Sequence, residues 1–293
     1  MPGTCPNRDG VLGEGGCIFC DEEGSGFACL PNTMAIEEQI TKNRAFFSSR
    51  FNAKKFIVYF QAYTNTYWDI ETFKSFMETA AQCDDIVGIS VSTRPDCMND
   101  DYLQVLQGIR SCYGVDIDVE LGLQTVNYRT LDKINRGHSL AEFIDALLRV
   151  KEKNFSSCIH LILNLPWDDM DDVVESAKMM SALAVQQVKL HSLYVVSGTK
   201  LGDMYQRGEF AVIPLSEYVD RAVTFLEYLS PHIVVQRLVG KGPQDKVLFN
   251  NWDRSWWYVK DQIEQTLIDR GTWQGKQCTY LNGKALKKIF NNN

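Results

Sequence analysis

Three cysteines near the start of the chain have the spacing of metal ligands. Cys5 comes first, and Cys17 and Cys20 form a CxxC pair. Thiolates are soft ligands that suit iron–sulfur clusters or zinc. Glycines at positions 10, 13, 15 and 16 allow the intervening backbone to curl around a compact metal site. Because three protein ligands leave one iron of a four-iron cluster open, the pattern predicts a reactive [4Fe-4S] cluster held by Cys5, Cys17 and Cys20.

A structural zinc site is the alternative that these cysteines leave open. Such a site needs a fourth Cys or His, and Cys29, nine residues after Cys20, could supply it. The chain would then be a zinc-stabilised binding module without catalysis. A disulfide framework is disfavoured, because the nine cysteines are an odd number at irregular spacing.

Short apolar runs of β type follow the cysteine loop at intervals of roughly 30 to 40 residues, the length of a βα unit. These runs are 56–60, 86–91, 117–121, 158–163, 188–196 and, more weakly, 233–236. Helical patterns fill the intervals, and we expect helices over 70–81, 102–110, 143–150, 169–184 and 216–229. Repeated βα units predict parallel strands joined by right-handed crossovers. The fold class is therefore α/β, either a doubly wound sheet or a barrel.

Polar residues are placed to start three of these helices. Asp69 is expected to cap the helix over 70–81, and Asp100 or Asp101 to open the helix over 102–110. Ser139 has capping-box spacing to a glutamate three residues later. Gly137 is expected to end the helix before it.

Composition and charge limit the kinds of protein this chain can be. With 293 residues, 45% of them hydrophobic, it can bury a sizeable core. No apolar run is long enough to span a bilayer and no leader opens the chain, so we expect a cytoplasmic protein with no membrane partner. The βα rhythm stops near residue 210. We therefore predict a core over 1–210 and a Trp-rich C-terminal extension over 211–293 that packs on it.

The net charge of −7 disfavours a general nucleic-acid binder, because phosphate contacts need clustered Lys and Arg. A local basic patch could still form near the C-terminus, from Lys276, Lys284, Lys287 and Lys288. A solvated tail is the simpler interpretation of the same lysines.

The motifs and their order resemble a known family. The segments CPNRDG and GGCIFC, STRPDC (92–97), ELGLQT (120–125), INRGH (134–138) and VKLHSLYVVSGT (188–199) are similar to those of bacterial YhcC/YtqA-type radical S-adenosylmethionine (SAM) enzymes. The core also resembles the radical SAM domain of the Elongator catalytic subunit, which shares the ELGxQ…NRGH signature. This resemblance implies a partial (β/α)6 barrel of the TIM type, with SAM at the C-terminal ends of the strands. Since the cysteine motif begins at residue 5, we expect the first strand of such a barrel to be missing.

The resemblance also implies residues that bind SAM. Phe19, just before the third cysteine, would lie near the adenine. Gln124 and Arg136 match a Gln–Arg pair that contacts SAM in oxygen-independent coproporphyrinogen oxidases, and an Arg fork suits a carboxylate. His160 takes the strand position of a ribose-binding Asp.

The SAM amine has two candidate partners. The stretch that begins at Gln61 replaces the Gly-Gly-Glu motif that often holds this amine, and Glu120 could provide a carboxylate instead. Simpler roles stay open for the others. Gln124 could satisfy strand-end backbone groups, Arg136 could pair with an acid, and His160 could be a core histidine.

Four residues near strand ends are candidate catalytic groups. Lys189 and His191 occupy alternate positions of one strand, so their side chains share a face. We expect this face to be the barrel interior, because two ionisable groups buried under helices would lack partners. Asp96 and Cys97 follow a predicted strand, where such barrels place reactive residues. Asp96 could instead be a turn residue, and Cys97 could relay a hydrogen atom or be a structural thiol.

The expected reaction is reductive cleavage of SAM to methionine and a 5′-deoxyadenosyl radical, which abstracts a hydrogen atom from the substrate. The implied partner is an external one-electron reductant of the flavodoxin or ferredoxin type. The Elongator resemblance points to tRNA modification by an oxidoreductase or transferase, at the side chain on carbon 5 of a wobble uridine. A small metabolite or a peptide is the alternative substrate.

Overall fold

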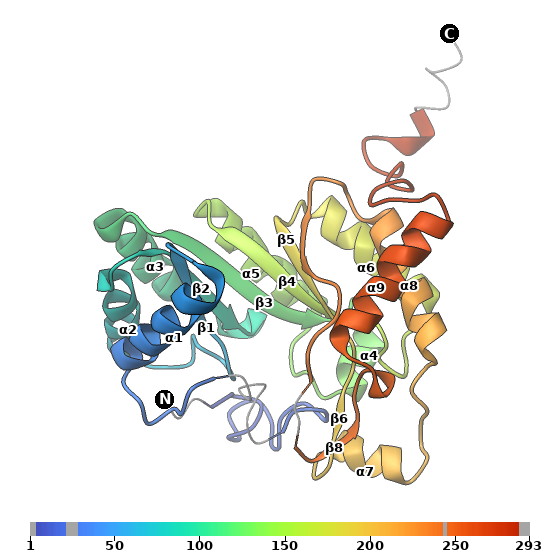
Figure 1. Ribbon diagram of the computed structural model, residues 1–293, viewed down its shortest axis with the longest axis horizontal. Helices are drawn as coiled ribbons and strands as arrows, with labels where there is room; N and C mark the ends of the chain where they lie inside the picture. Colours follow the sequence, from blue (N-terminus) through green and yellow to red (C-terminus); the bar gives the residue numbers. More distant parts are fainter. Residues whose placement is uncertain (1–3, 22–28, 243–244, 287–293) are drawn as a thin grey trace. The chain divides into compact units, whose positions relative to one another are not determined.

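The computed structural model describes residues 4–21, 29–242 and 245–286. Six strands form one sheet in the order β1-β2-β3-β4-β5-β7, and the pairs β1–β2, β2–β3 and β5–β7 are parallel (Figure 1). A doubly wound sheet would reverse its strand order at a switch point. Here each strand instead lies beside the next one in sequence, which is the order of a barrel. The α/β class is confirmed, and the strand order decides between its two forms.

The strands are the apolar runs that the sequence predicts, with the same bounds for β1 and shifted ends for the others. Their bounds are β1 Phe56–Phe60, β2 Ile86–Thr93, β3 Asp116–Gln124, β4 Ser156–Ile162, β5 Gln187–His191 and β7 Val234–Arg237. β2 continues past the expected end because Thr93 still pairs with Leu121 of β3.

The run expected over 188–196 is two strands and not one. β5 ends at His191, and β6 (Val195–Val196) pairs antiparallel with β8 (Val247–Phe249) in a separate small sheet. Between β5 and β6, the backbone N–H of Leu193 donates to Asn164 Oδ1 at 2.7 Å. This side chain replaces a backbone partner of the main sheet, so the chain turns away there.

Helices lie between most of the strands. Their bounds are α1 Ile36–Phe51, α2 Ile70–Gln82, α3 Asp100–Tyr113, α4 Tyr128–Lys133, α5 Leu140–Glu152, α6 Met170–Ala182, α7 Lys200–Gln206, α8 Leu215–Tyr228 and α9 Trp256–Asp269. Two short 3-10 helices cover Pro95–Cys97 and Asn251–Asp253. The sequence patterns did not predict α1, α7 or α9, and for α4 they gave only an expected end at Gly137.

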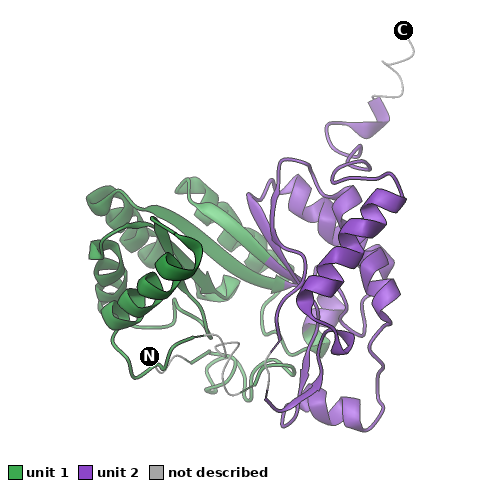
Figure 2. Ribbon diagram, in the orientation of Figure 1, with its two compact units in different colours: residues 1–123, 132–159 green, residues 124–131, 160–293 purple. Residues whose placement is uncertain are grey.

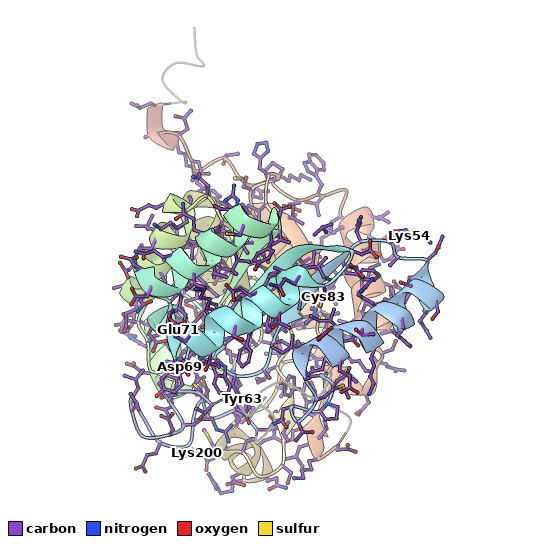
Figure 3. All side chains as sticks on the ribbon, turned by 90° about the vertical axis from the view of Figure 1, so that its left-hand side faces the viewer. Lys54, Tyr63, Asp69, Glu71, Cys83 and Lys200 are labelled. Carbon is purple, nitrogen blue, oxygen red and sulfur yellow. The ribbon has the colours of Figure 1, made fainter. Side chains whose placement is uncertain are left out.

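Two of the predicted helix starts are confirmed. Asp69 accepts a hydrogen bond from the backbone N–H of Thr72 at 2.9 Å at the start of α2, and Cys83 lies just past the other end of this helix (Figure 3). At the start of α5, Ser139 and Glu142 form a reciprocal capping box, with N–H donors at 2.6 and 3.4 Å. A cap of this kind satisfies amides that the first turn leaves without partners.

Two other helix signals have different outcomes. α3 opens at Asp100, one of the two expected positions, and the side chain that caps it is Asn99, which accepts from Tyr102 N at 3.2 Å. Because α3 starts before residue 102, both aspartates lie in its first turn, where their charge favours the helix dipole. Gly137 does not end a helix, because α4 already ends at Lys133.

Contacts divide the chain into two compact units (Figure 2). Unit 1 comprises residues 1–123 and 132–159, and unit 2 comprises 124–131 and 160–293, so the boundary crosses β4. In unit 1, α2 packs against α3, and Phe73 and Phe143 are fully buried. In unit 2, α8 packs against α6 and α9, and Tyr218 and Phe225 are fully buried. The domain boundary at residue 210 stays a prediction.

Among the described residues, the helices are too short or too polar for any of them to cross a bilayer.

Candidate active site

The cysteine loop of unit 1 is a series of tight turns. Arg8 N donates to Cys5 O at 2.8 Å, Cys20 N donates to Cys17 O at 2.9 Å, and Gly16 N returns to Asn7 O at 2.7 Å. Gly16 has a φ of 78°, in the left-handed region that favours glycine. Cys17 is buried, and Cys5 and Cys20 are partly exposed. Local turn chemistry therefore brings the three thiols into one loop.

This loop is attached to the segment that follows α4. Ile18 N donates to Ile134 O at 3.0 Å, and Asn135 Nδ2 donates to Gly16 O at 2.8 Å. In the opposite direction, Asn7 Nδ2 donates to Asn135 O at 2.6 Å. The INRGH motif thus holds the cysteine loop in place by hydrogen bonds in both directions.

Two of the three cysteine sulfur atoms face side-chain N–H donors. Arg136 Nη1 lies 3.6 Å and Asn7 Nδ2 3.9 Å from Cys17 Sγ, and Arg8 Nη1 lies 3.7 Å from Cys20 Sγ. Hydrogen bonds to cysteine sulfurs are a common feature of protein-bound iron–sulfur clusters. The donor set therefore fits a site for thiolates and not for neutral packed thiols.

The Cys20 thiol stays protonated without a metal. Burial raises the pKa of Cys20 to about 11, the Cys17 charge raises it further, and Arg8 opposes the rise. Because a metal ligand must be a thiolate, iron has to displace this proton on binding.

The spacing of the cysteines does not fit zinc. A tetrahedral zinc site with bonds of about 2.3 Å puts its sulfur atoms roughly 3.8 Å apart. Within the described part of the chain, the cysteines Cys5, Cys17, Cys20 and Cys29 give no group of three with ligand atoms all within 4.8 Å of one another. The Cys29 thiol is instead hydrogen-bonded to Gln61. A four-iron cluster fits better, because it binds each cysteine through a different iron.

Arg94 and Asp96 form a buried ion pair in unit 1, next to the same loop. Arg94 Nε and Nη2 donate to the two carboxylate oxygens of Asp96 at 2.9 and 2.7 Å. Burial alone would lower the pKa of Arg94, but the bond and charge of Asp96, with the charges of Cys5 and Cys17, raise it above its ordinary value. Arg94 Nη1 is buried and has no hydrogen-bond partner among the described residues. This orphan donor is suited to an anionic group bound at the loop.

Cys97 lies in the 3-10 helix after β2, beside Asp96. Burial raises the pKa of Cys97 to about 12, and the Asp96 charge raises it further. The side chain is therefore a thiol at neutral pH, which keeps its hydrogen atom.

The predicted SAM ligands of unit 1 have varied surroundings. Arg136 is buried, and its Nε and Nη2 both donate to Gly122 O, at 3.2 and 2.5 Å. Since Nη1 faces Cys17, this guanidinium is already occupied by the loop and the end of β3. Glu120 is buried and accepts from Ser90 Oγ at 2.8 Å. Phe19 and Gln61 are half-buried.

Unit 2 contains the other predicted residues. His160 on β4 and His191 on β5 stack with ring centroids 5.1 Å apart. Lys189 is buried on the same strand as His191, and Gln124 at the end of β3 has a φ of 80°. The structure thus brings the two histidines together, and the functional roles of all four residues stay predictions.

Sequence reasoning missed several polar residues around the cysteines. Asn7, Arg8 and Asn135 lie inside the quoted motifs CPNRDG and INRGH, and only Arg136 was singled out there. His138 is buried, with Nδ1 3.2 Å from Ser139 O and Nε2 3.3 Å from Gly122 O. The available signal was polar residues crowded next to a metal motif.

A loop with three cysteines, together with a sheet of parallel βα units, is typical of SAM enzymes that depend on an iron–sulfur cluster. The chain belongs to the radical SAM superfamily, because the sequence model of that family matches residues 5–180. The model of the Radical_SAM C-terminal domain matches residues 185–269. It is a radical SAM enzyme that uses a [4Fe-4S] cluster and SAM. The predicted class and cofactors are confirmed.

Two curated relatives illustrate the range of similarity. The chain is 35% identical to Uncharacterized protein YtqA of Bacillus subtilis (strain 168) over 272 residues, which cover 93% of this chain and 84% of that one. This match confirms the predicted family. A shorter match, 27% identical over 130 residues, covers 42% of this chain and 23% of the tRNA uridine(34) acetyltransferase of Methanocaldococcus jannaschii.

A solved structure supports the fold. The archaeal Methanocaldococcus infernus Elp3 with an N-terminal deletion matches with a TM-score of 0.70 and 17% identity. The match covers 82% of this chain and 60% of that one, so the chain spans little more than half of the solved protein. The likeness confirms the predicted partial barrel of Elongator type.

Proposed function

We propose that Cys5, Cys17 and Cys20 hold the cluster, and that the enzyme modifies the side chain of a wobble uridine in tRNA. The observation that supports the cluster site is the loop itself, where the thiols of Cys17 and Cys20 meet N–H donors from Asn7, Arg8 and Arg136. When bound, the cluster and SAM supply one-electron cleavage of SAM and a 5′-deoxyadenosyl radical. The protein supplies binding, orientation and exclusion of water.

In this proposal, SAM binds beside the loop. Arg94 offers a buried Nη1 donor for the carboxylate of SAM. We favour Arg94 over Arg136 for this contact, because Arg136 already donates to Gly122 O and faces Cys17 Sγ. The remaining proposed SAM contacts are Phe19, Gln61, Glu120, Gln124 and His160.

The proposed catalytic groups are Asp96, Cys97, Lys189 and His191. Cys97 has the property that hydrogen-atom donation needs, because its raised pKa keeps the S–H intact at neutral pH. Asp96 holds Arg94 in place through two hydrogen bonds. Lys189 and His191 lie on one strand, as expected for groups that face substrate.

Two observations support tRNA as the substrate. One relative that matches part of the chain is named a tRNA uridine(34) acetyltransferase. The segment 271–286 contains Lys276 and Lys284 and no carboxylate side chain, so it is locally basic in an acidic chain. Lys287 and Lys288, the other lysines of the predicted patch, lie outside the described residues.

The cluster is tested by anaerobic reconstitution with iron and sulfide, followed by SAM and dithionite. We expect about four irons per chain and 5′-deoxyadenosine, both lost in Cys5→Ala, Cys17→Ala and Cys20→Ala. Cys29→Ala is the matched control and should keep both. Bound zinc, or an unchanged cluster in the three variants, would contradict the assignment.

The substrate is tested with tRNA from cells that lack this enzyme. The reconstituted enzyme with SAM and reductant should change the mass of a wobble-uridine nucleoside, and Lys276→Ala with Lys284→Ala should weaken tRNA binding and reduce its salt dependence. If SAM is cleaved but no nucleoside changes and tRNA does not bind, the substrate is a small metabolite or a peptide.

A further inference from the structure

The N–H donors around the cysteine loop are distributed unequally over the three sulfur atoms. Cys17 Sγ faces Arg136 Nη1 and Asn7 Nδ2, and Cys20 Sγ faces Arg8 Nη1, at 3.6 to 3.9 Å. Cys5 Sγ has no side-chain N–H donor in the described part of the chain. The loop therefore surrounds two ligands with donors and leaves the third without them.

Asn7 is held rigidly in its place. The residue is 1% exposed, and its Nδ2 donates to Asn135 O at 2.6 Å and also faces Cys17 Sγ. Its Oδ1 lies 2.7 Å from where a Cβ on Gly13 would be, and 2.8 Å from where one on Gly137 would be. A Cβ at either position would force this amide oxygen to shift, so the two glycines leave the space that the Asn7 side chain occupies.

Arg136 is also fixed in direction. Two of its nitrogens donate to Gly122 O, which leaves Nη1 pointing at Cys17 Sγ. A guanidinium held at two points loses little freedom when the third nitrogen meets a charged partner. Its charge is buried and therefore weakly screened, so its effect on the cluster is large for its distance.

We propose that Asn7, Arg8 and Arg136 are positioning residues that set the reduction potential of the four-iron cluster, by donating N–H bonds to the sulfurs of Cys17 and Cys20. The inference rests on the proposed ligation by Cys5, Cys17 and Cys20. Reduction adds an electron to the cluster and raises its negative charge. Donors and cations at the sulfurs stabilise that charge, so they raise the potential and make the cluster easier to reduce.

The test measures the cluster and not the turnover. Reconstituted protein without SAM is titrated with reductant, and the reduced cluster is followed by electron paramagnetic resonance. Asn7→Asp keeps the side-chain shape but removes both N–H groups, and Arg136→Gln removes the charge. Each should lower the midpoint potential by at least 59 mV, a tenfold change in the one-electron equilibrium.

Two further variants separate tuning from folding. Asn135→Gly removes the hydrogen bond from Nδ2 to Gly16 O, and glycine tolerates the φ of 51° at that position. Because the Asn135 side chain contacts no sulfur among the described residues, the midpoint potential should not change, even if the variant retains less iron. Arg8→Gln removes the guanidinium that faces Cys20 Sγ. Because Arg8 is partly exposed, this variant can still be measured if the variants at the buried residues Asn7 and Arg136 fail to hold a cluster. It should lower the midpoint as well.

The outcomes distinguish this inference from the proposed ligation. If the cysteine variants lose the cluster but the Asn7, Arg8 and Arg136 variants keep the wild-type midpoint, the ligands are right and the tuning is wrong. A shift in Asn135→Gly equal to that in Asn7→Asp would also overturn the inference, because loop distortion would then explain it. A cluster that persists in the cysteine variants would overturn the ligation itself.

Discussion

Replacing His138 by glutamine should remove a specific acid sensitivity from unit 1. The His138 imidazole is buried between carbonyl oxygens, and this burial, with the charges of Arg136 and Arg94, lowers its pKa to about 3. In the unfolded chain the imidazole titrates at its ordinary value of 6.5. The native state therefore binds fewer protons than the unfolded state between these values, and stability is lost as the pH falls below 6.5.

The size of the effect follows from the two pKa values. At pH 5.5 the unfolded imidazole is one unit below its pKa, so its protonation stabilises the unfolded state by RT ln(1 + 10), about 1.4 kcal/mol. At pH 7.5 the same contribution is below about 0.1 kcal/mol. The glutamine side chain introduced by His138→Gln cannot titrate, but it can still donate one N–H to a carbonyl oxygen.

Urea unfolding of the metal-free protein at pH 7.5 and 5.5 measures the difference. When the pH is lowered from 7.5 to 5.5, the free energy of unfolding of the wild type should fall by about 1.4 kcal/mol more than that of His138→Gln. All other titrating groups, the remaining three of the four histidines included, are common to both proteins and cancel in the comparison. Equal losses in the two proteins would show that the buried imidazole is protonated in the native state, and the reasoning would fail.

Two further predictions concern other parts of the chain. Burial raises the pKa of Asp168 to about 6, so its contribution to stability is present at low pH and lost as the pH rises. Between pH 5 and 7 the wild type should lose about 1 kcal/mol relative to Asp168→Asn in urea unfolding, and a difference of the opposite sign would refute the assigned cause. A Cβ on Gly202 of α7 would lie 2.2 Å from Val196 O, whereas one on Gly108 of α3 would meet nothing within 4 Å. Gly202→Ala should lower the free energy of unfolding by about 1–3 kcal/mol, and Gly108→Ala should raise it by about 0.5–1 kcal/mol, both measured by thermal unfolding. Similar effects of the two substitutions would contradict the close packing of α7 against β6.

Local signals in the sequence were sufficient for much of the fold. The apolar run at 56–60 is β1 without a shift, and Ser139 forms its capping box because the partner is three residues away. Features set by distant residues were not predictable in this way. β5 ends at His191 because Asn164, 29 residues away from Leu193 along the chain, supplies the acceptor for the Leu193 backbone N–H.

The site shows the same division. The cysteine ligands were recognisable by type and spacing within 16 residues. Arg136 was interpreted as a SAM contact from its motif and its spacing. In the structure its nitrogens already face Gly122 O and Cys17 Sγ, which lie 14 and 119 residues away along the chain. Spacing identifies residue types that suit a ligand, but it does not tell which of them the protein itself already binds.

The bonds between the cysteine loop and Asn135 have a consequence for the order of events during synthesis. The loop leaves the ribosome first, yet its partners follow 119 and 128 residues later. At about 5–20 residues per second, translation delays the closed form of the loop by roughly 6 to 26 seconds. During that interval the thiols are exposed to any metal or oxidant in the cell. The closed form of the loop is therefore available to iron only after Asn135 has been made, when more than half of the 293-residue chain is still to be translated.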